Sequence, residues 1–120
     1  MVSRFNFRAW NSKNKEFNYF GFDYVKGCNL PTNQNYIEKA PIMQSTGHID
    51  KNKKEVFDGD IVFDGAEYSI IEYNQERLRF QEYRKTSIDT INAYTLSHRE
   101  IVGNIIENRD LAIKIKTLKE

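Results

Sequence analysis

The sequence predicts a mainly β protein, α+β at most, that forms a single domain over residues 1–120. Aromatic residues make up 13% of the chain, and Phe and Tyr, which dominate them, favour the pleated surface of a sheet. Several stretches alternate apolar and polar residues with the period of a strand. Gly, Asn and Asp separate these stretches as turn residues. A chain of this length buries roughly two-thirds of its unfolded surface, which is enough for one core.

The charge balance and the cysteine content limit the functional classes. Eighteen basic and seventeen acidic side chains leave a net charge of +1, which argues against a strongly basic face for DNA or anionic lipid. Cys28 is the lone cysteine, so an internal disulfide and a thiolate metal cage are excluded. The N-terminal residues lack the apolar stretch of a signal peptide, and no run is long enough to span a membrane. We therefore expect a cytoplasmic protein that does not act at a membrane.

The N-terminal residues 4–25 predict an aromatic hairpin. Apolar and polar residues alternate from Phe5 to Ala9, which places Arg8 on the polar face of the first strand. Residues 11–14 form the turn. The apolar phase of the second strand changes near Gly21, so we expect a β-bulge over residues 19–21.

The middle of the chain predicts a loop followed by closely spaced turns. Residues 26–40 are rich in Asn and contain Gly and Pro, which is typical of a loop. A strand should then start at Pro41 and end where Gly47 begins a turn. Residues 50–55 form a second turn, and Asp58-Gly59 is a third, because Gly accepts a positive φ without steric cost.

A second hairpin is the firmest local prediction. Its strands are separated by residues 74–76. The first strand should present Ala66, Tyr68 and Ile70 to one face. Its partner should present Leu78 and Phe80 to one face, with Arg77, Arg79 and Gln81 on the opposite face.

The C-terminal third predicts one strand and one helix. Residues 86–100 fit either a short helical turn or extended chain. Residues 100–106 are rich in β-branched side chains and predict the final strand. Asn108 or Asp110 can then cap a helix over residues 108–119, where lysines suit the negative end of the helix dipole.

Three segments carry a resemblance to a known family. They are FRAWNSKNKEF at residues 7–17, MQSTGHIDKNKKEVFDGDIV at residues 43–62 and IVGNIIENRDL at residues 101–111. In this order and spacing they resemble the YopX family of phage and prophage proteins. The middle segment is the most specific, since eight of its residues fit the family pattern: Gly47, Asp50, Lys54, Glu55, Gly59, Asp60, Ile61 and Val62.

The resemblance implies a small Src-homology-3-like β-barrel over residues 41–106, with the hairpin packed on it. Its strands should lie around Ile42, Ile61, Tyr68, Phe80 and Val102. It also implies oligomerisation and a phage or prophage origin, and it implies no activity. Lys53 stands where the family usually has Gly, so the left-handed residue of that turn should shift to Asn52.

No set of residues predicts catalysis or a cofactor. A hydrolase would need two carboxyl groups at a defined separation, and the clustered acids Asp58, Asp60, Asp64 and Glu67 mostly adjoin glycines, where Asp shapes turns. His48 and His98 have no ligand partners at zinc spacing, so no metal is expected. A catalytic thiol needs an electropositive setting or a paired His, and the sequence around Cys28 indicates neither. The predicted turn residues are Gly47, Asp50, Asp58, Gly59, Asp60 and Gly103.

The remaining candidates are contacts for a partner. They are Lys51, Lys53, Lys54, Arg77, Arg79 and Trp10. The basic residues suit nucleic acid, although neighbouring acids such as Glu55 and Glu76 dilute their charge. Trp10 lies in the polar half of the first strand, where it either covers the barrel or anchors a partner. Our leading hypothesis is a non-enzymatic phage or prophage accessory protein that binds protein, first of all itself. The alternative is a nucleic-acid-binding barrel.

Overall fold

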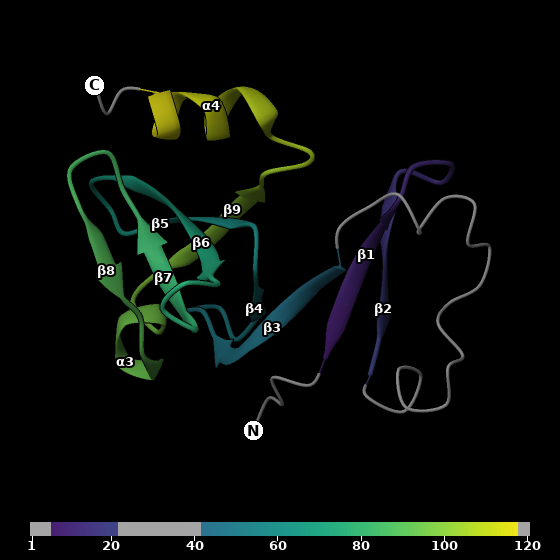
Figure 1. Cartoon of the computed structure of the whole chain (residues 1–120), viewed down its shortest axis with the longest axis horizontal. Helices are drawn as coiled ribbons and strands as arrows, with labels where there is room; N and C mark the ends of the chain where they lie inside the picture. Colours follow the sequence, from purple (N-terminus) through teal and green to yellow (C-terminus); the bar gives the residue numbers. More distant parts are fainter. Residues whose placement is uncertain (1–5, 22–41, 118–120) are drawn as a thin grey trace.

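The structure is a computed structural model, and it describes residues 6–21 and 42–117 (Figure 1). The described residues form nine strands and two helices, which confirms the mainly β prediction. The predicted loop over residues 26–40, which contains Cys28, lies outside the described residues, as does the end of the predicted hairpin at residues 22–25.

Strands β1 (Phe7–Asn11) and β2 (Glu16–Phe20) form the N-terminal antiparallel hairpin, which we call the arm. Asn11 shapes the turn, because its Oδ1 accepts hydrogen bonds from the backbone N–H groups of Lys13 and Asn14. The ladder runs without a register shift up to Phe20, where the strand ends. The predicted bulge is therefore wrong, and the change of apolar phase coincides with the end of β2.

Strand β3 (Ile42–Ile49) joins the arm to the rest of the molecule. Its first residues pair with β1, and its later residues pair with β4 (Glu55–Phe57), so that the sheet order is β2-β1-β3-β4. The register shifts between Ser45 and Ile49, where Gly47 has a φ of 83°. Gly47 thus lies at an irregularity inside a strand, and the prediction that it begins a turn is wrong.

The two turns that flank β4 follow the local sequence closely. Asp50 Oδ1 accepts hydrogen bonds from the N–H groups of Asn52 and Lys54, each 2.8 Å long. The left-handed residue is Lys53, with a φ of 66°, and not Asn52 as expected. Gly59 has a φ of 92° in the Asp58-Gly59 turn, and an added Cβ there would lie 2.9 Å from the Met43 side chain.

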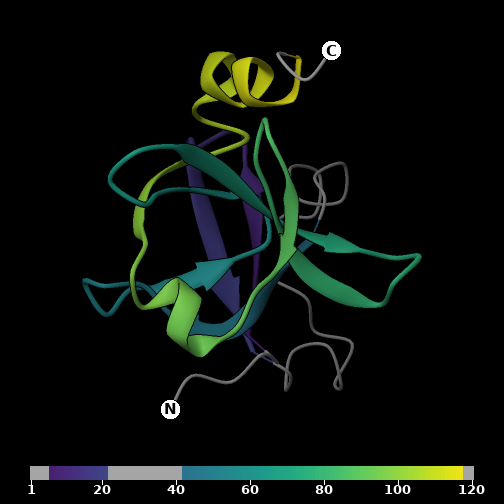
Figure 2. The ribbon, with the colours of Figure 1, turned by 90° about the vertical axis from the view of Figure 1, so that its left-hand side faces the viewer.

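The second sheet has the order β8-β7-β6-β5-β9 and curls into a half-barrel (Figure 2). Its strands are β5 (Asp60–Phe63), β6 (Tyr68–Asn74), β7 (Arg79–Tyr83), β8 (Ile88–Thr90) and β9 (Glu100–Asn104). With β3 and β4 they surround one apolar interior, and we call this body the barrel. The interior consists of Val56, Val62, Ile71 and Leu96, with Phe80, Ile91 and Ile101 packed against them.

Two helices close the barrel from different sides. Helix α3 (Ala93–Leu96) is capped by Asn92, and Leu96 fills the interior, so residues 86–100 contain both an extended strand and a helical turn. Helix α4 (Arg109–Thr117) lies over the outer face of the second sheet (Figure 1). Its Ala112 and Ile115 pack with Ile61 and Ile70.

Asn108 links β9 to the start of α4. Its side-chain Oδ1 accepts a hydrogen bond from the N–H of Asn104, and its backbone carbonyl accepts one from the N–H of Ala112 in the helix. A Cβ on Gly103 would overlap this Asn108 side chain. Gly103 therefore permits a close approach within β9, and its assignment as a turn residue is wrong.

The β6–β7 hairpin is present, but its boundaries are shifted. The connection is a turn over residues 75–78, which places Leu78 at the tip with a φ of 55° and 75% of its surface exposed. Ala66 lies exposed before β6. Leu78 thus lies in the turn and Ala66 lies outside β6, so the prediction that they belong to the faces of these two strands is wrong. Ile42 and Val102 lie in the expected strands with their side chains exposed.

Candidate protein-binding surfaces

A buried ion pair fixes the arm to the barrel. Arg8 Nη2 donates a 2.8 Å hydrogen bond to Asp60 Oδ1, and the two residues are only 4% and 2% exposed. The Arg8 guanidinium also lies 4.1 Å from the ring centre of Phe17 and 4.8 Å from that of Phe57. Arg8 thus lies on the face opposite Phe7 and Ala9, as the alternation predicts, but it is buried there. The sequence could not show this contact, because the two partners are separated by 52 positions.

Burial makes ionisation of Asp60, the acidic member of this pair, less favourable. Burial raises the pKa of Asp60 to about 6, although the charge of Arg8 and the 2.7 Å hydrogen bond from the Phe57 N–H favour the carboxylate. Burial likewise raises the pKa of Asp58, whose Oδ1 accepts a 3.3 Å hydrogen bond from the Tyr73 N–H. Asp58 and Asp60, two of the clustered acids that a hydrolase could use, thus both make contacts that shape the fold.

The other predicted acids also have structural partners. Asp64 Oδ1 accepts hydrogen bonds from the N–H groups of Ala66 and Glu67, and these bonds hold the pKa of Asp64 below its usual value. Glu67 Oε1 lies 3.4 Å from Arg84 Nη1, with which it forms an ion pair. In the described part of the chain, no group of three or more His, Cys, Asp or Glu residues could hold a metal ion.

Glu82 is a structural centre that the sequence did not indicate. Its carboxylate is buried and accepts hydrogen bonds from Ser69 at 2.6 Å, Arg99 at 2.7 Å and Arg84 at 3.2 Å. Burial opposes ionisation, but the hydrogen bonds from Arg99 and Ser69 and the nearby positive charges outweigh it and lower the pKa of Glu82. Ser69 and Arg99 are 13 and 17 positions away from Glu82, so no local pattern could have identified this site.

The arm presents a row of aromatic rings on the face that carries Arg8. Trp10 packs edge-on against Phe17, with 5.0 Å between ring centres, and is half-buried. Tyr19 packs edge-on against Phe57 of the barrel at 5.5 Å, yet 61% of Tyr19 is exposed. A cavity of about 350 Å³ lies where Tyr19 and Phe57 meet Arg8 and Asp60. The arm thus packs against the barrel through Phe57 and displays an exposed aromatic side chain.

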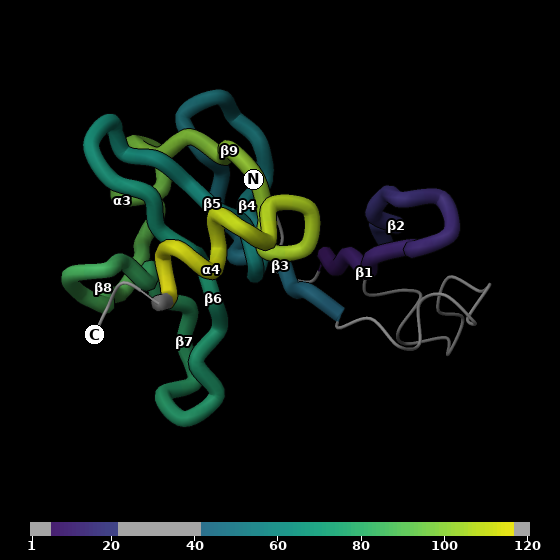
Figure 3. The backbone as a smooth tube through the Cα atoms, turned by 90° about the horizontal axis from the view of Figure 1, so that it is seen from above, coloured from purple at the N-terminus to yellow at the C-terminus, as the bar shows by residue number. Residues whose placement is uncertain are grey.

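The basic candidates do not form one surface. Lys51, Lys53 and Lys54 are exposed in the turn between β3 and β4, while Arg77 and Arg79 belong to the β6–β7 hairpin. Figures 2 and 3 place these two turns on opposite sides of the barrel. The structure therefore does not join the two groups into a continuous basic ribbon.

The histidines lie in different elements. His48 is half-buried in β3, and His98 is exposed after α3, where its ring lies against Tyr94.

No helix among the described residues is both long and apolar enough to cross a membrane.

Comparison with known proteins identifies the family. A sequence model of the YopX protein family matches residues 6–112. The chain belongs to the YopX family. The fold of this YopX protein is similar to the crystal structure of protein EF1440 from Enterococcus faecalis, with a TM-score of 0.59. The two chains are 22% identical, and the match covers 91% of this chain and 99% of the other. No curated protein matched the chain.

Proposed function

We propose that this YopX protein is a non-catalytic phage or prophage accessory protein that acts in the cytoplasm of the host by binding protein. Its first partner is a second copy of itself, and the arm is the contact surface. The observation that carries this proposal is Tyr19, an aromatic side chain that is 61% exposed on the outer strand of its sheet.

The geometry of the arm suits association in two ways. Strand β2 is the outer strand of the order β2-β1-β3-β4, and an edge strand offers backbone groups to a further strand. The Tyr19 ring packs edge-on against Phe57, and the Arg8–Asp60 ion pair connects the arm to the barrel. Because the arm is already ordered, binding would cost little conformational entropy, and aromatic residues are frequent at the energetic centre of interfaces.

The contacts of the acidic residues support the non-catalytic part of the proposal. Asp60 is occupied by Arg8 and by the Phe57 N–H, and Asp58 accepts from the Tyr73 N–H. Each carboxylate thereby has a structural role that explains its position.

Sedimentation velocity at micromolar concentrations tests the proposal. We expect the wild-type protein to self-associate and Tyr19→Lys to shift it to monomer, because a charge would be buried at the contact. Tyr94→Lys is the matched control, since Tyr94 is 74% exposed on α3 and lies outside the arm. Thermal melting of each variant shows that it is folded. A wild-type monomer at all these concentrations, or unchanged association of Tyr19→Lys, contradicts the proposal.

A further inference from the structure

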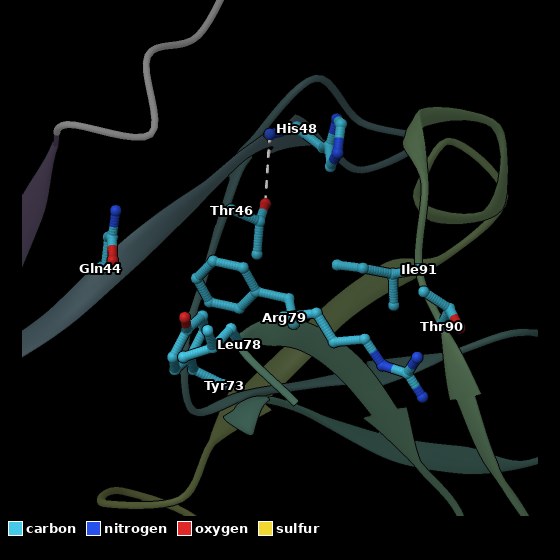
Figure 4. Close-up of a pocket in the computed structure, with 9 residues that line it drawn as sticks. Gln44, Thr46, His48, Tyr73, Leu78, Arg79, Thr90 and Ile91 are labelled. Atoms are coloured by element: carbon cyan, nitrogen blue, oxygen red, sulfur yellow. Dashed lines mark hydrogen bonds between the residues drawn. The ribbon is translucent and has the colours of Figure 1, made fainter. Parts of the chain in front are cut away.

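A second surface, separate from the arm, has the features of a ligand groove. It is a cavity of about 480 Å³ between β3 and the β6–β7 hairpin, within the usual range of roughly 300–1,000 Å³ for binding sites. Figure 4 shows Thr46 and His48 along β3 on one side and Thr90 and Ile91 across from them. The hairpin contributes Tyr73, Leu78, Arg79 and Phe80.

Arg79 is a cation without an anion in this groove. Its side chain is half-buried, and it makes no ion pair with the residues that the structure describes; its Nε–H is buried without an acceptor, as are those of Arg8 and Arg84. The buried or half-buried arginines Arg8, Arg84 and Arg99 all bind carboxylates. The groove has no acidic lining residue, and His48 is its other basic group. A half-buried guanidinium without a carboxylate partner, in a groove without acids, is suited to an anionic group from outside.

Leu78 adds an apolar contact at the mouth of the groove. It is 75% exposed and has a φ of 55°, a conformation that Gly or Asn adopts far more readily. A leucine here is unfavourable both for its backbone and for its exposure to water. Strain of this kind is typical of binding positions. Tyr73 and Phe80, which pack edge-on with 5.1 Å between ring centres, extend the apolar surface into the groove.

We propose that this groove binds an acidic–apolar segment of a partner protein, with a carboxylate on Arg79 and an apolar side chain between Leu78 and Phe80. Charge complementarity supports this occupant, because the groove offers cations and no anion. The edge strand β8 contributes Thr90 to the groove, so the segment's main chain can pair beside it. Nucleic acid fits less well, because the β3–β4 turn that carries the lysines lies on the opposite side of the barrel (Figure 2) and the rings of Tyr73 and Phe80 pack against each other.

Selection from a displayed library of random peptides against the full-length protein tests this proposal. We expect the enriched peptides to carry Asp or Glu beside an apolar residue. A synthetic peptide from this set should bind Arg79→Gln at least about tenfold more weakly than wild type, because a charge-assisted hydrogen bond is lost. Leu78→Asn should also weaken binding while the fold is retained.

Arg77→Gln is the matched control, since Arg77 lies two residues away on the same hairpin and does not line the groove. Its affinity should equal that of wild type. The proposal is overturned if no peptide is enriched, or if the peptide binds Arg79→Gln as tightly as wild type. It is also overturned if an oligothymidylate binds in a salt-sensitive way that Arg79→Gln abolishes, because the groove would then be a nucleic-acid site. Self-association of the arm is unaffected by any of these results.

Discussion

Burying an arginine with a single aspartate brings little net stability, because both charges lose their hydration. In this protein Arg8 is also sandwiched between Phe17 and Phe57, whose ring faces attract a cation. For Asp60, burial outweighs the charge of Arg8 and the hydrogen bond from the Phe57 N–H, and it raises the pKa to about 6. The pair therefore places the arm at a defined position, and its acidic member makes stability depend on pH.

The stability that Asp60 contributes should decrease as the pH rises. Its folded pKa of about 6 exceeds its ordinary 3.8, so the folded state holds the proton longer than the unfolded state. Unfolding free energy therefore falls between about pH 4 and pH 6, by on the order of 3 kcal/mol. In Asp60→Asn this contribution is absent. Urea titrations of both proteins from pH 4 to pH 7 should show the wild-type value falling relative to that of the variant, and a constant difference would contradict this assignment.

Relieving the left-handed leucine should stabilise the protein. In Leu78→Asn the φ of 55° becomes acceptable, and an exposed apolar side chain is replaced by a polar one. We expect the unfolding free energy to rise by about 0.5–1 kcal/mol. Chemical denaturation measures it. An equal or lower stability would mean that the tip is not strained.

At the scale of the elements, the second sheet is covered on both faces. Ile71 and Val62 face the barrel interior, while Ile61 and Ile70 face α4. This explains why neighbouring residues in β5 and β6 are buried together, without the alternation of a sheet that has one wet face. Helix α4 is thus a second layer of the core.

Truncating the buried side of α4 should be far more costly than truncating its exposed side. Ile115→Ala leaves a cavity against Ile61 and Ile70, so we expect a loss of about 2–4 kcal/mol in unfolding free energy. Ile113→Ala removes the same atoms at an exposed position of the same helix and should cost less than about 1 kcal/mol. Equal losses in urea denaturation would show that α4 is not docked.

The sequence predicts those parts of the fold that are determined locally. The Asp58-Gly59 turn and the β6–β7 hairpin depend on neighbouring residues and are present. The exposure of Leu78 was missed because the turn is one residue longer than expected. The burial of Arg8 and Glu82 could not be predicted, since their partners are distant in sequence. The groove was missed for the same reason, although Arg79 was singled out.

At the scale of the whole molecule, the arm stands beside the barrel and shares one strand with it (Figure 3). Strand β3 carries hydrogen bonds to both parts, and the Arg8–Asp60 pair is a second connection. Asn6 adds a third, because its Nδ2 donates a 2.9 Å hydrogen bond to Glu55. That residues 1–120 form a single domain stays a prediction. The exchange rates of backbone amides in the arm and in the barrel test it.

Weakening the junction should loosen the arm first. Arg8→Gln removes the charge that binds Asp60 and stacks between two rings, so the backbone amides of β1 and β2 should exchange faster. The amides of β6 in the barrel should keep their protection. Hydrogen exchange followed by nuclear magnetic resonance measures both sets. If all amides accelerate together, the arm and the barrel unfold as one unit.

The double use of β3 makes its length matter more than its composition. Successive side chains of a strand point to opposite sides of the sheet. Deleting one residue between Met43 and Ser45 would therefore exchange the two faces of the arm relative to the barrel. Arg8 would then point away from Asp60, and Tyr19 would leave Phe57. Insertions and deletions in descendants of this protein should accordingly avoid this short stretch, whereas substitutions at its exposed positions should be common.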